Sequence, residues 1–343
     1  MKRNPSDGRP GGLTAGRPAA FAVALILTVW PSGRLAAQEA PLNTGALFLV
    51  FPVGAQAVGM GQTAMAAAGR GDAAFWNPAG LATLANNEFS LHSGNLVAGR
   101  SHVLSAFFPS EGIGVVGGAV YLVDYGDLER TDANGNTIAR IAPRNFELLA
   151  SYATALAGSF VFGVSYKLVQ LRVDCSGDCR GFPSGAGTTH ALDLGGQFEL
   201  GAGGPLRIGI ALRNLGFKLQ VENQAQADPL PTRLAVGVLY RLRLQPRDGG
   251  TLDERFDVKV AADVDSPWGQ VGASQTRVGI DVGYQQLLRV RAGYAFVQDG
   301  LSGPSVGLGL ETGSLGVDLA RAFLAGSDLQ VDDPTFFSFR VTF

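Results

Sequence analysis

Cys175 and Cys179, the two cysteines of the chain, are separated by three residues. Outside the cytoplasm, two cysteines at this spacing form a small disulfide loop. A zinc site is the alternative, but none of the three histidines, His92, His102 and His190, lies at a zinc-like spacing from the pair. We therefore expect a disulfide here, and no metal or other cofactor.

Two further patterns suggest chemistry but lack the surroundings that it requires. The stretch from Gly59 to Ala64, GMGQTA, fits a variant of the dinucleotide-binding fingerprint, which needs a βαβ unit and a downstream acidic residue. Segments of alternating apolar and polar residues follow it instead. Ser101 and His102 have neither a G-x-S-x-G element nor a convincing acidic partner. We expect the protein not to be an enzyme.

The N-terminus has the three parts of a secretory signal peptide. Lys2 and Arg3 begin a basic region, residues 19–30 are apolar, and Leu35-Ala36-Ala37 is suited to cleavage. A membrane anchor is the alternative, but the apolar stretch is too short to span a membrane as a helix. We expect residues 1–37 to be removed and the mature chain to begin outside the cytoplasm.

From residue 88 onward, apolar and polar residues alternate with the period of two that is typical of strands. Most connections after odd-numbered strands are long, and most after even-numbered strands are tight. About fourteen strands are predicted in this way, with errors of a few residues at each boundary. They are 88–95, 99–109, 112–125, 144–155, 158–174, 188–200, 204–218, 232–244, 255–265, 275–285, 288–297, 304–311, 314–324 and 335–343.

These features predict an all-β fold, a transmembrane outer-membrane β-barrel of about 14 antiparallel strands over residues 88–343. Short turns at one end, long loops at the other and an outward apolar face are typical of barrels in the bacterial outer membrane, where the surrounding partner is lipid. A soluble sandwich or propeller has no reason to separate loop lengths by strand parity. The formal net charge of −2 gives no reason to expect nucleic acid as a partner.

The last strand ends the chain on an aromatic residue. Its alternating residues Phe337, Phe339, Val341 and Phe343 resemble the C-terminal signal by which bacterial outer-membrane barrels are recognised for assembly. We therefore expect the barrel-assembly machinery as a partner.

Charged residues share one face of many predicted strands, which would line the lumen. A selective charged channel and a salt-bridged, hydrated interior both remain compatible with this pattern. The residues include Arg213, Arg233, Asp263, Arg277, Asp281, Arg289, Arg291 and Arg340.

A stretch rich in glycine and alanine precedes the strands and contains Gly59-Met60-Gly61, Asp72 and Trp76-Asn77-Pro78-Ala79-Gly80. This pattern resembles the N-terminus of the PorV/PorQ family. More distantly it is similar to FadL-like (OmpP1/FadL) barrels. In those families the fold is a fourteen-stranded barrel with this segment inside, so the resemblance implies that residues 38–87 form a plug or hatch. Asn77 suits the N-cap and Pro78 the first position of a short helix there. The motif residues are Gly59, Met60, Gly61, Asp72, Trp76, Asn77, Pro78, Ala79 and Gly80.

The resemblance implies two different functions. The expected one is a binding and shuttle component for protein secretion to the cell surface, of a type IX-like kind, with exported proteins or secretion-system components as partners. The alternative is a FadL-like channel for hydrophobic small molecules such as fatty acids, in which a kinked third strand opens the wall sideways. Gly117 and Gly118 lie in the third strand and mark either such a wall kink or close packing against the plug.

Overall fold

The computed structural model describes residues 44–67, 69–180, 185–201, 203–220, 227–242, 256–268, 274–298, 301–324 and 332–343. The predicted signal peptide, residues 1–37, and the first residues of the predicted plug, 38–43, lie outside the described residues. The described residues before the first strand, 44–67 and 69–87, are called the N-terminal segment below.

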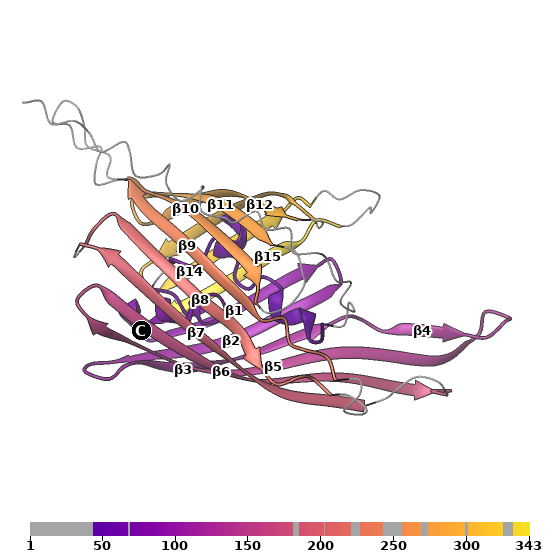
Figure 1. Ribbon diagram of the computed structural model, residues 1–343. Coiled ribbons are helices and arrows are strands. Elements are labelled where there is room, and N and C mark those ends of the chain that lie inside the picture. The colour runs from indigo at the N-terminus through magenta and orange to yellow at the C-terminus, as the bar shows by residue number, and fades with distance from the viewer. Residues whose placement is uncertain are drawn as a thin grey trace, which may run out of the picture. The chain divides into compact units, whose positions relative to one another are not determined.

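Fourteen antiparallel strands close a barrel around the N-terminal segment (Figure 1). Two pairings close the barrel. The last strand pairs with the first, and the third strand pairs directly with the fifth, so that the short fourth strand lies outside the barrel wall. The strands are β1 (Glu88–Leu96), β2 (Gly99–Ser110), β3 (Gly114–Asp124), β4 (Leu128–Thr131), β5 (Thr137–Ala157), β6 (Phe160–Gly177), β7 (Gly185–Leu200), β8 (Leu206–Gly216), β9 (Arg233–Leu242), β10 (Phe256–Pro267), β11 (Gln275–Tyr284), β12 (Leu288–Val297), β13 (Gly303–Thr312), β14 (Leu315–Ala322) and β15 (Thr335–Thr342).

The predicted fourteen-stranded barrel is confirmed, and most strand boundaries lie within two or three residues of those expected. The main difference is an extension of β5 and β6 beyond the rest of the wall, on which β4 pairs with β5 (Figure 1). The sequence pattern missed β4, whose four residues are too few to show a period, and placed it in a loop.

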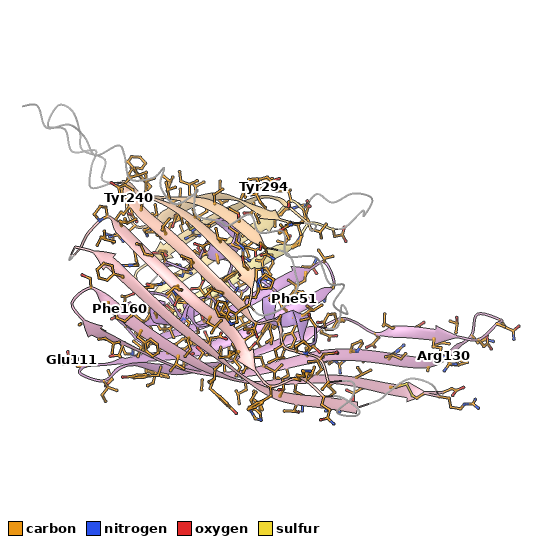
Figure 2. All side chains as sticks on the ribbon, in the orientation of Figure 1. Phe51, Glu111, Arg130, Phe160, Tyr240 and Tyr294 are labelled. Carbon is orange, nitrogen blue, oxygen red and sulfur yellow. A yellow bond between two sulfur atoms is a disulfide. The ribbon has the colours of Figure 1, made fainter. Side chains whose placement is uncertain are left out.

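The outer face of the wall is apolar, as expected for a barrel surrounded by lipid. Exposed aromatic residues gather toward the two ends of the strands, as in the aromatic girdles of outer-membrane barrels. Figure 2 shows Phe160 and Tyr240 on the wall toward the end at which Glu111 lies. At that end the group is Phe89, Phe108, Phe160, Phe198, Tyr240, Phe256 and Tyr284, and at the other it is Tyr166, Phe217, Trp268, Phe296 and Phe323.

The two ends of the barrel differ in the length of their connections. Most turns at the end that carries Glu111 are two to five residues long, whereas the other end carries the β4 extension and most of the long loops. Short turns of outer-membrane barrels face the periplasm and long loops face the exterior. The protein is thus a bacterial outer-membrane barrel whose β4 extension, which ends near Arg130, is extracellular (Figure 2).

The N-terminal segment contains short helices joined by irregular backbone. They are η1 (Leu47–Val50), α1 (Ala55–Gly59), η2 (Gly71–Phe75) and η3 (Pro78–Thr83). Within the described part of the chain, no helix has the length and apolar character that crossing a membrane requires. Irregular backbone is tolerated here because the wall shields it from lipid.

The interior of the barrel has an apolar side and a charged side. On β3 the inward residues, among them Tyr121, are apolar, whereas on β2 and β5 apolar residues such as Phe107 and Leu149 are mixed with polar ones such as Ser105 and Glu147. The apolar residues pack against those of the N-terminal segment. On β9 to β15 the inward face is largely charged and buried. The N-terminal segment lies between two chemically different walls.

Candidate functional site: the lumen and the N-terminal segment

Asn77 joins three parts of the structure inside the lumen. Its side-chain Nδ2 donates to the carbonyl oxygens of Met65, at 2.7 Å, and of Gly196 in β7, at 3.2 Å. Its Oδ1 accepts from the backbone nitrogen of Ala79, which makes it the N-cap of η3. Asn77 is completely buried, so an unpaired amide would be costly at this position.

Glycines of the wall let the N-terminal segment approach the strand backbone directly. A Cβ atom on Gly195 of β7 would lie 2.1 Å from Oδ1 of Asn77, and one on Gly163 of β6 would lie 2.3 Å from the carbonyl carbon of Pro78. Cβ atoms essentially never come that close to another heavy atom. The other wall glycines in such contact are Gly209, Gly237, Gly279, Gly293 and Gly307, on β8, β9, β11, β12 and β13.

Gly59, Met60 and Gly61 of the segment also lie against glycines of the wall. Gly61 has a φ of +67°, which only glycine adopts without strain, and its nitrogen donates to Ser305 Oγ at 3.0 Å. Gly59 lies against Gly307, where an added Cβ would be 2.9 Å from the Gly307 Cα. Met60 is buried between them and faces Gly279 with its carbonyl oxygen.

Side chains of the wall bind backbone amides of the segment. Oδ2 of Asp263 on β10 accepts from the backbone nitrogens of Ala64 and Met65, at 2.7 and 3.0 Å. Oε1 of Glu88 accepts from Gly71 at 2.7 Å, and Oγ of Ser338 accepts from Ala55 at 2.9 Å. The wall thereby supplies acceptors that irregular backbone cannot supply to itself.

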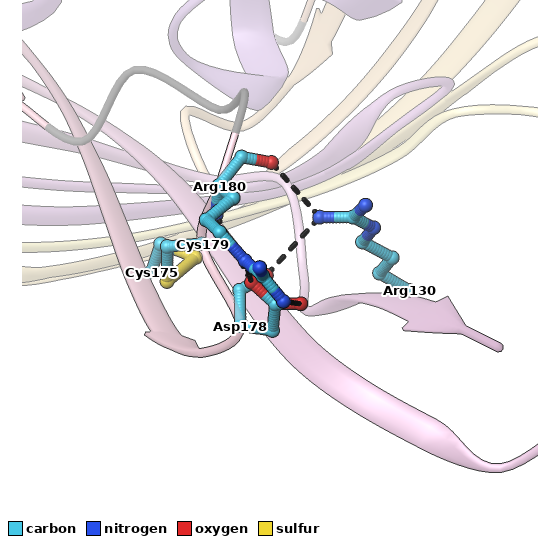
Figure 3. Close-up of a disulfide and its surroundings, with 5 residues drawn as sticks. All are labelled: Arg130, Cys175, Asp178, Cys179 and Arg180. Atoms are coloured by element: carbon cyan, nitrogen blue, oxygen red, sulfur yellow. Dashed lines mark hydrogen bonds and ion pairs between the residues drawn. A yellow bond between two sulfur atoms is a disulfide. The ribbon is translucent and has the colours of Figure 1, made fainter.

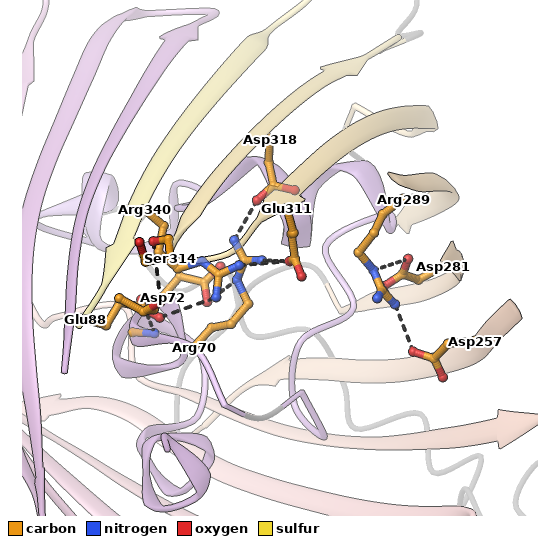
Figure 4. A network of polar contacts seen from close by, with 12 residues as sticks. Arg70, Asp72, Glu88, Asp257, Asp281, Arg289, Glu311, Ser314, Asp318 and Arg340 are labelled. Carbon is orange, nitrogen blue, oxygen red and sulfur yellow. Dashed lines mark hydrogen bonds and ion pairs between the residues drawn. The ribbon is translucent and has the colours of Figure 1, made fainter. Parts of the chain in front are cut away.

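An ionic network runs along the charged side, and Figure 4 shows two parts of it, around Arg70 and around Arg289. Arg70 of the segment contacts Asp318 on β14 at 2.6 Å and Glu311 on β13 at 3.2 Å. Its pKa is raised because four carboxylates outweigh the effect of burial. The network continues through Arg291, Asp281, Arg289, Asp257 and Lys259 on β10 to β12, and through Arg340 and Glu88 on β15 and β1.

Trp76 lies in a second charged cluster. The guanidinium groups of Arg213 and Arg277 are 5.5 and 5.6 Å from the centre of its rings, within cation–π range. Both arginines also pair with Asp265, as does Arg233. The indole Nε1 of Trp76 donates to the carbonyl of Val53 at 2.9 Å, which ties two distant parts of the segment together.

One small cavity lies beside the segment in the lumen. This cavity of ≈ 20 Å³, about the room that one water molecule needs, lies beside Gln56, Arg70 and Asp72. Asp72 also approaches Gly54, whose φ is +89°. In this state the segment itself occupies this part of the lumen.

Gly117 and Gly118 lie in a continuous part of the wall. β3 pairs with β2 and with β5 through both residues without a register shift. The strand alternates throughout, since Val115, Gly117, Ala119, Tyr121 and Val123 face inward and the residues between them face outward. The ring of Phe107 packs directly over Gly117, and a kink at the pair stays a prediction.

Cys175 and Cys179 form a disulfide at the extracellular end of β6, with a Cα–Cα distance of 6.0 Å (Figure 3). Nη1 of Arg130 on β4 donates to the carbonyl oxygens of Asp178 and Arg180, at 3.1 and 3.0 Å. The bond therefore shapes a loop to which the extension is attached, and it lies apart from the lumen. In the described residues, no group of three or more His, Cys, Asp or Glu could hold a metal.

Sequence reasoning missed the wall glycines and the apolar side of the lumen. The glycines carry a visible signal, since many predicted strands contain one near the middle, on the face that also carries the charges. The apolar side is hidden in the period-two pattern, because inward and outward residues of β3 are both apolar.

No protein-family model and no curated protein matches the chain. Several solved structures match its fold. The toluene transporter TbuX of Ralstonia pickettii aligns with 84% of this chain and 98% of its own, at a TM-score of 0.58 and 14% identity. The toluene transporter TodX of Pseudomonas putida aligns with 84% of this chain and 98% of its own, at a TM-score of 0.58 and 15% identity. A FadL homologue of Pseudomonas aeruginosa aligns with 85% of this chain and 98% of its own, at a TM-score of 0.54 and 13% identity. At these identities the likeness shows the fold, a FadL-type barrel; none of the three is a PorV or PorQ protein, and that resemblance stays an expectation.

Proposed function

We propose that the protein is a channel for hydrophobic small molecules in the outer membrane, with the N-terminal segment as its hatch. The observation that carries this proposal is the apolar side of the lumen. Along β3, inward residues from Val123 at the extracellular end to Val115 near the periplasmic end are apolar without interruption. In the present state this surface packs against the N-terminal segment, and an apolar molecule that took the place of the segment would gain the same apolar contacts.

The hatch is held on one side of the lumen by apolar packing and on the other by polar contacts, which can exchange with water when it moves. Asn77, Arg70 and the amides of Ala64 and Met65 bind the wall through hydrogen bonds and ion pairs. The glycine contacts add close packing but little apolar area. Displacing the segment would expose the apolar side, from Phe107 to Tyr121, to a passing molecule. The similar structures include toluene transporters and a monoaromatic hydrocarbon channel, which supports the same class of cargo.

Uptake by cells tests the proposal. Cells that lack their own channels of this kind would carry the gene or an empty vector, and initial uptake of radiolabelled toluene and oleate would be compared. We expect faster uptake of at least one of the two probes, which also separates aromatic hydrocarbons from fatty acids. Equal rates with and without a correctly folded barrel, checked by unheated and boiled gel samples, would overturn the channel function.

A second candidate function, the shuttle for exported proteins, has one observation in its favour. The extension formed by β4, β5 and β6 provides an exposed extracellular platform with a disulfide-bonded loop, which a small-molecule channel does not require. Affinity isolation from gently solubilised outer membrane tests it. Co-purified exported proteins or an attachment enzyme would support the shuttle, and bound lipid or fatty acid without a protein partner would count against it.

A further inference from the structure

A pocket of ≈ 350 Å³ lies on the outer face of the wall, where β6, β7 and β8 meet near the extracellular end. This size is within the range of about 300–1,000 Å³ that is common for small-molecule sites. Its lining is mainly apolar, and the rings of Tyr166 and His190 stack with their centres 5.8 Å apart. The lining residues are Tyr166, His190, Ala191, Leu192, Leu215, Gly216 and Phe217.

The pocket coincides with a β-bulge in the wall. Between the pairs Leu192↔Leu215 and Leu194↔Leu212, two residues of β8 oppose the single residue Asp193 of β7. Among the barrel pairings of the described residues, the other register shift adjoins the tight β5–β6 turn at Ala155. The β7–β8 bulge is therefore the irregular point within the lipid-facing wall.

At the bulge, a side chain replaces part of the backbone ladder. Oδ1 of Asp193 accepts from the backbone nitrogen of Asn214 at 2.7 Å, and Asn214 has a φ of +57°. Lys167 on β6 contacts Asp193 at 2.7 Å and Asn214 Oδ1 at 2.9 Å. A contact through side chains can break by rotation about side-chain bonds, whereas regular ladder pairs separate only when whole strands move.

Gly216 lines the pocket beside the bulge and is exposed. A Cβ atom on Gly216 would meet the β7 backbone at the His190 carbonyl oxygen, at 2.1 Å, and Cδ1 of Leu230, at 2.9 Å. Leu230 is 2% exposed and belongs to the apolar core of the lumen. Displacing Leu230 would join the pocket to the apolar side of the lumen.

The same region is linked to the N-terminal segment. The chain leaves Gly216 and turns inward, so that Leu219 and Leu230 are both buried in the core that contains Phe48 of the segment. The carbonyl oxygen of Pro229 accepts from the backbone nitrogen of Gly45 at 2.9 Å. A movement of the segment would thus be transmitted to the side chain that closes the pocket from inside.

We propose, on the basis of the channel function above, that the β7–β8 bulge is a lateral portal at which an apolar small molecule passes between the lumen and the membrane. The molecule binds in the pocket, against the Tyr166 and His190 rings. It then passes Gly216 when Leu230 and the hatch move. The portal lies several strands away from Gly117 and Gly118.

Reversible disulfide locks test the portal in the uptake assay with toluene and oleate. All variants carry Cys175→Ser and Cys179→Ser, so that reductant acts only on the introduced pairs. The portal lock is Leu192→Cys with Leu215→Cys, two opposed outward residues on β7 and β8. A matched control lock is Val290→Cys with Leu308→Cys on β12 and β13, and a lock beside the glycine pair is Phe108→Cys with Val116→Cys on β2 and β3.

We expect the portal lock to lose most of the uptake above the empty-vector background and to regain it on reduction, while the control lock keeps its uptake. Unchanged uptake with a fully formed portal lock would overturn the portal, as would an equal loss in the control lock. Loss confined to the β2–β3 lock would place the passage at Gly117 and Gly118 instead. Absence of uptake in both the wild type and the unlocked Cys-free barrel would mean that the channel function itself fails, and the portal with it.

Discussion

The guanidinium of Arg70 lies 2.6 Å from the carboxylate of Asp318, so that the N-terminal segment and β14 share a buried ion pair. Breaking a buried pair by removing one partner costs about 3–5 kcal/mol, because the other charge stays buried without its full compensation. We therefore expect Arg70→Met to loosen the hatch while the barrel itself still forms. The measurement is single-channel conductance in planar bilayers, which should rise.

Arg321→Met is the control for this prediction. Arg321 pairs with Asp333 at 2.8 Å, but its side chain is 55% exposed and the pair lies at the extracellular end. Exposed pairs contribute about 0–1 kcal/mol, so conductance should not change. If Arg70→Met conducts no better than the wild type, the ion pair does not hold the hatch.

Gly195 and Gly196 are neighbours on β7 that face opposite sides of the wall. A Cβ on Gly195 would lie 2.1 Å from Asn77, whereas one on Gly196 would be 3.4 Å from the nearest atom, on the outside. Overpacking of a tight site costs about 1–3 kcal/mol. We expect Gly195→Ala to displace the η3 end of the hatch and to speed its cleavage by added protease, and Gly196→Ala to behave like the wild type. Equal cleavage of the two variants would show that the segment does not depend on this contact.

The barrel could be predicted from the sequence because its signal is repeated in every strand. Along β10, for example, Asp263 and Asp265 face inward, and Val260 and Val264 face outward. The period of a strand and the lipid outside the barrel are enough to explain this alternation. A second, independent signal is that most long connections follow odd-numbered strands and most tight turns follow even-numbered ones. Neither depends on contacts between distant residues.

The interior could not be predicted in the same way, because it depends on which distant residues meet. Arg70 is 248 residues from Asp318, and nothing in either local sequence indicates their pairing. The β7–β8 bulge is hidden as well, since Arg213-Asn214 interrupts the alternation of β8 by a single residue. The role of Asn77 as a helix cap depends on neighbouring residues and could be predicted from the sequence. Its hydrogen bond to Gly196 depends on a distant strand and could not be predicted.

Asp178, in the loop after β6, predicts a pH response at the extracellular extension. Hydrogen bonds from the Arg180 side chain and backbone lower its pKa from 3.8 to about 2. The pair favours the charged carboxylate, so its stabilisation is complete above the ordinary pKa and is lost as the pH falls through about 2. A carboxyl carbon titration by NMR in detergent should place the midpoint there, and Arg180→Ala should return it toward the ordinary value. A midpoint near 3.8 in the wild type would contradict the pairing.

Phe343, the last residue, allows assembly and stability to be separated. Its side chain is 69% exposed on the outer face, so that removing it sacrifices little packing in the finished barrel. Its backbone nitrogen, by contrast, bonds to the carbonyl of Asn87 where β15 meets β1. We expect Phe343→Ala, which keeps that bond, to lower the fraction of folded barrel in cells, as the resemblance of the aromatic end to an assembly signal predicts. The fraction is measured as the band that shifts between unheated and boiled samples.

Phe296→Ala is the matched control, since Phe296 is 51% exposed on the outer face of β12 but lies far from the C-terminus in sequence. Folding of both variants in detergent, without cellular machinery, should equal that of the wild type. A loss of folded barrel in cells for Phe343→Ala alone, with unchanged folding in detergent, assigns the residue to assembly. If both variants fold equally well in cells, the aromatic end is not the signal, and closure of β15 on β1 is directed by the rest of the strand.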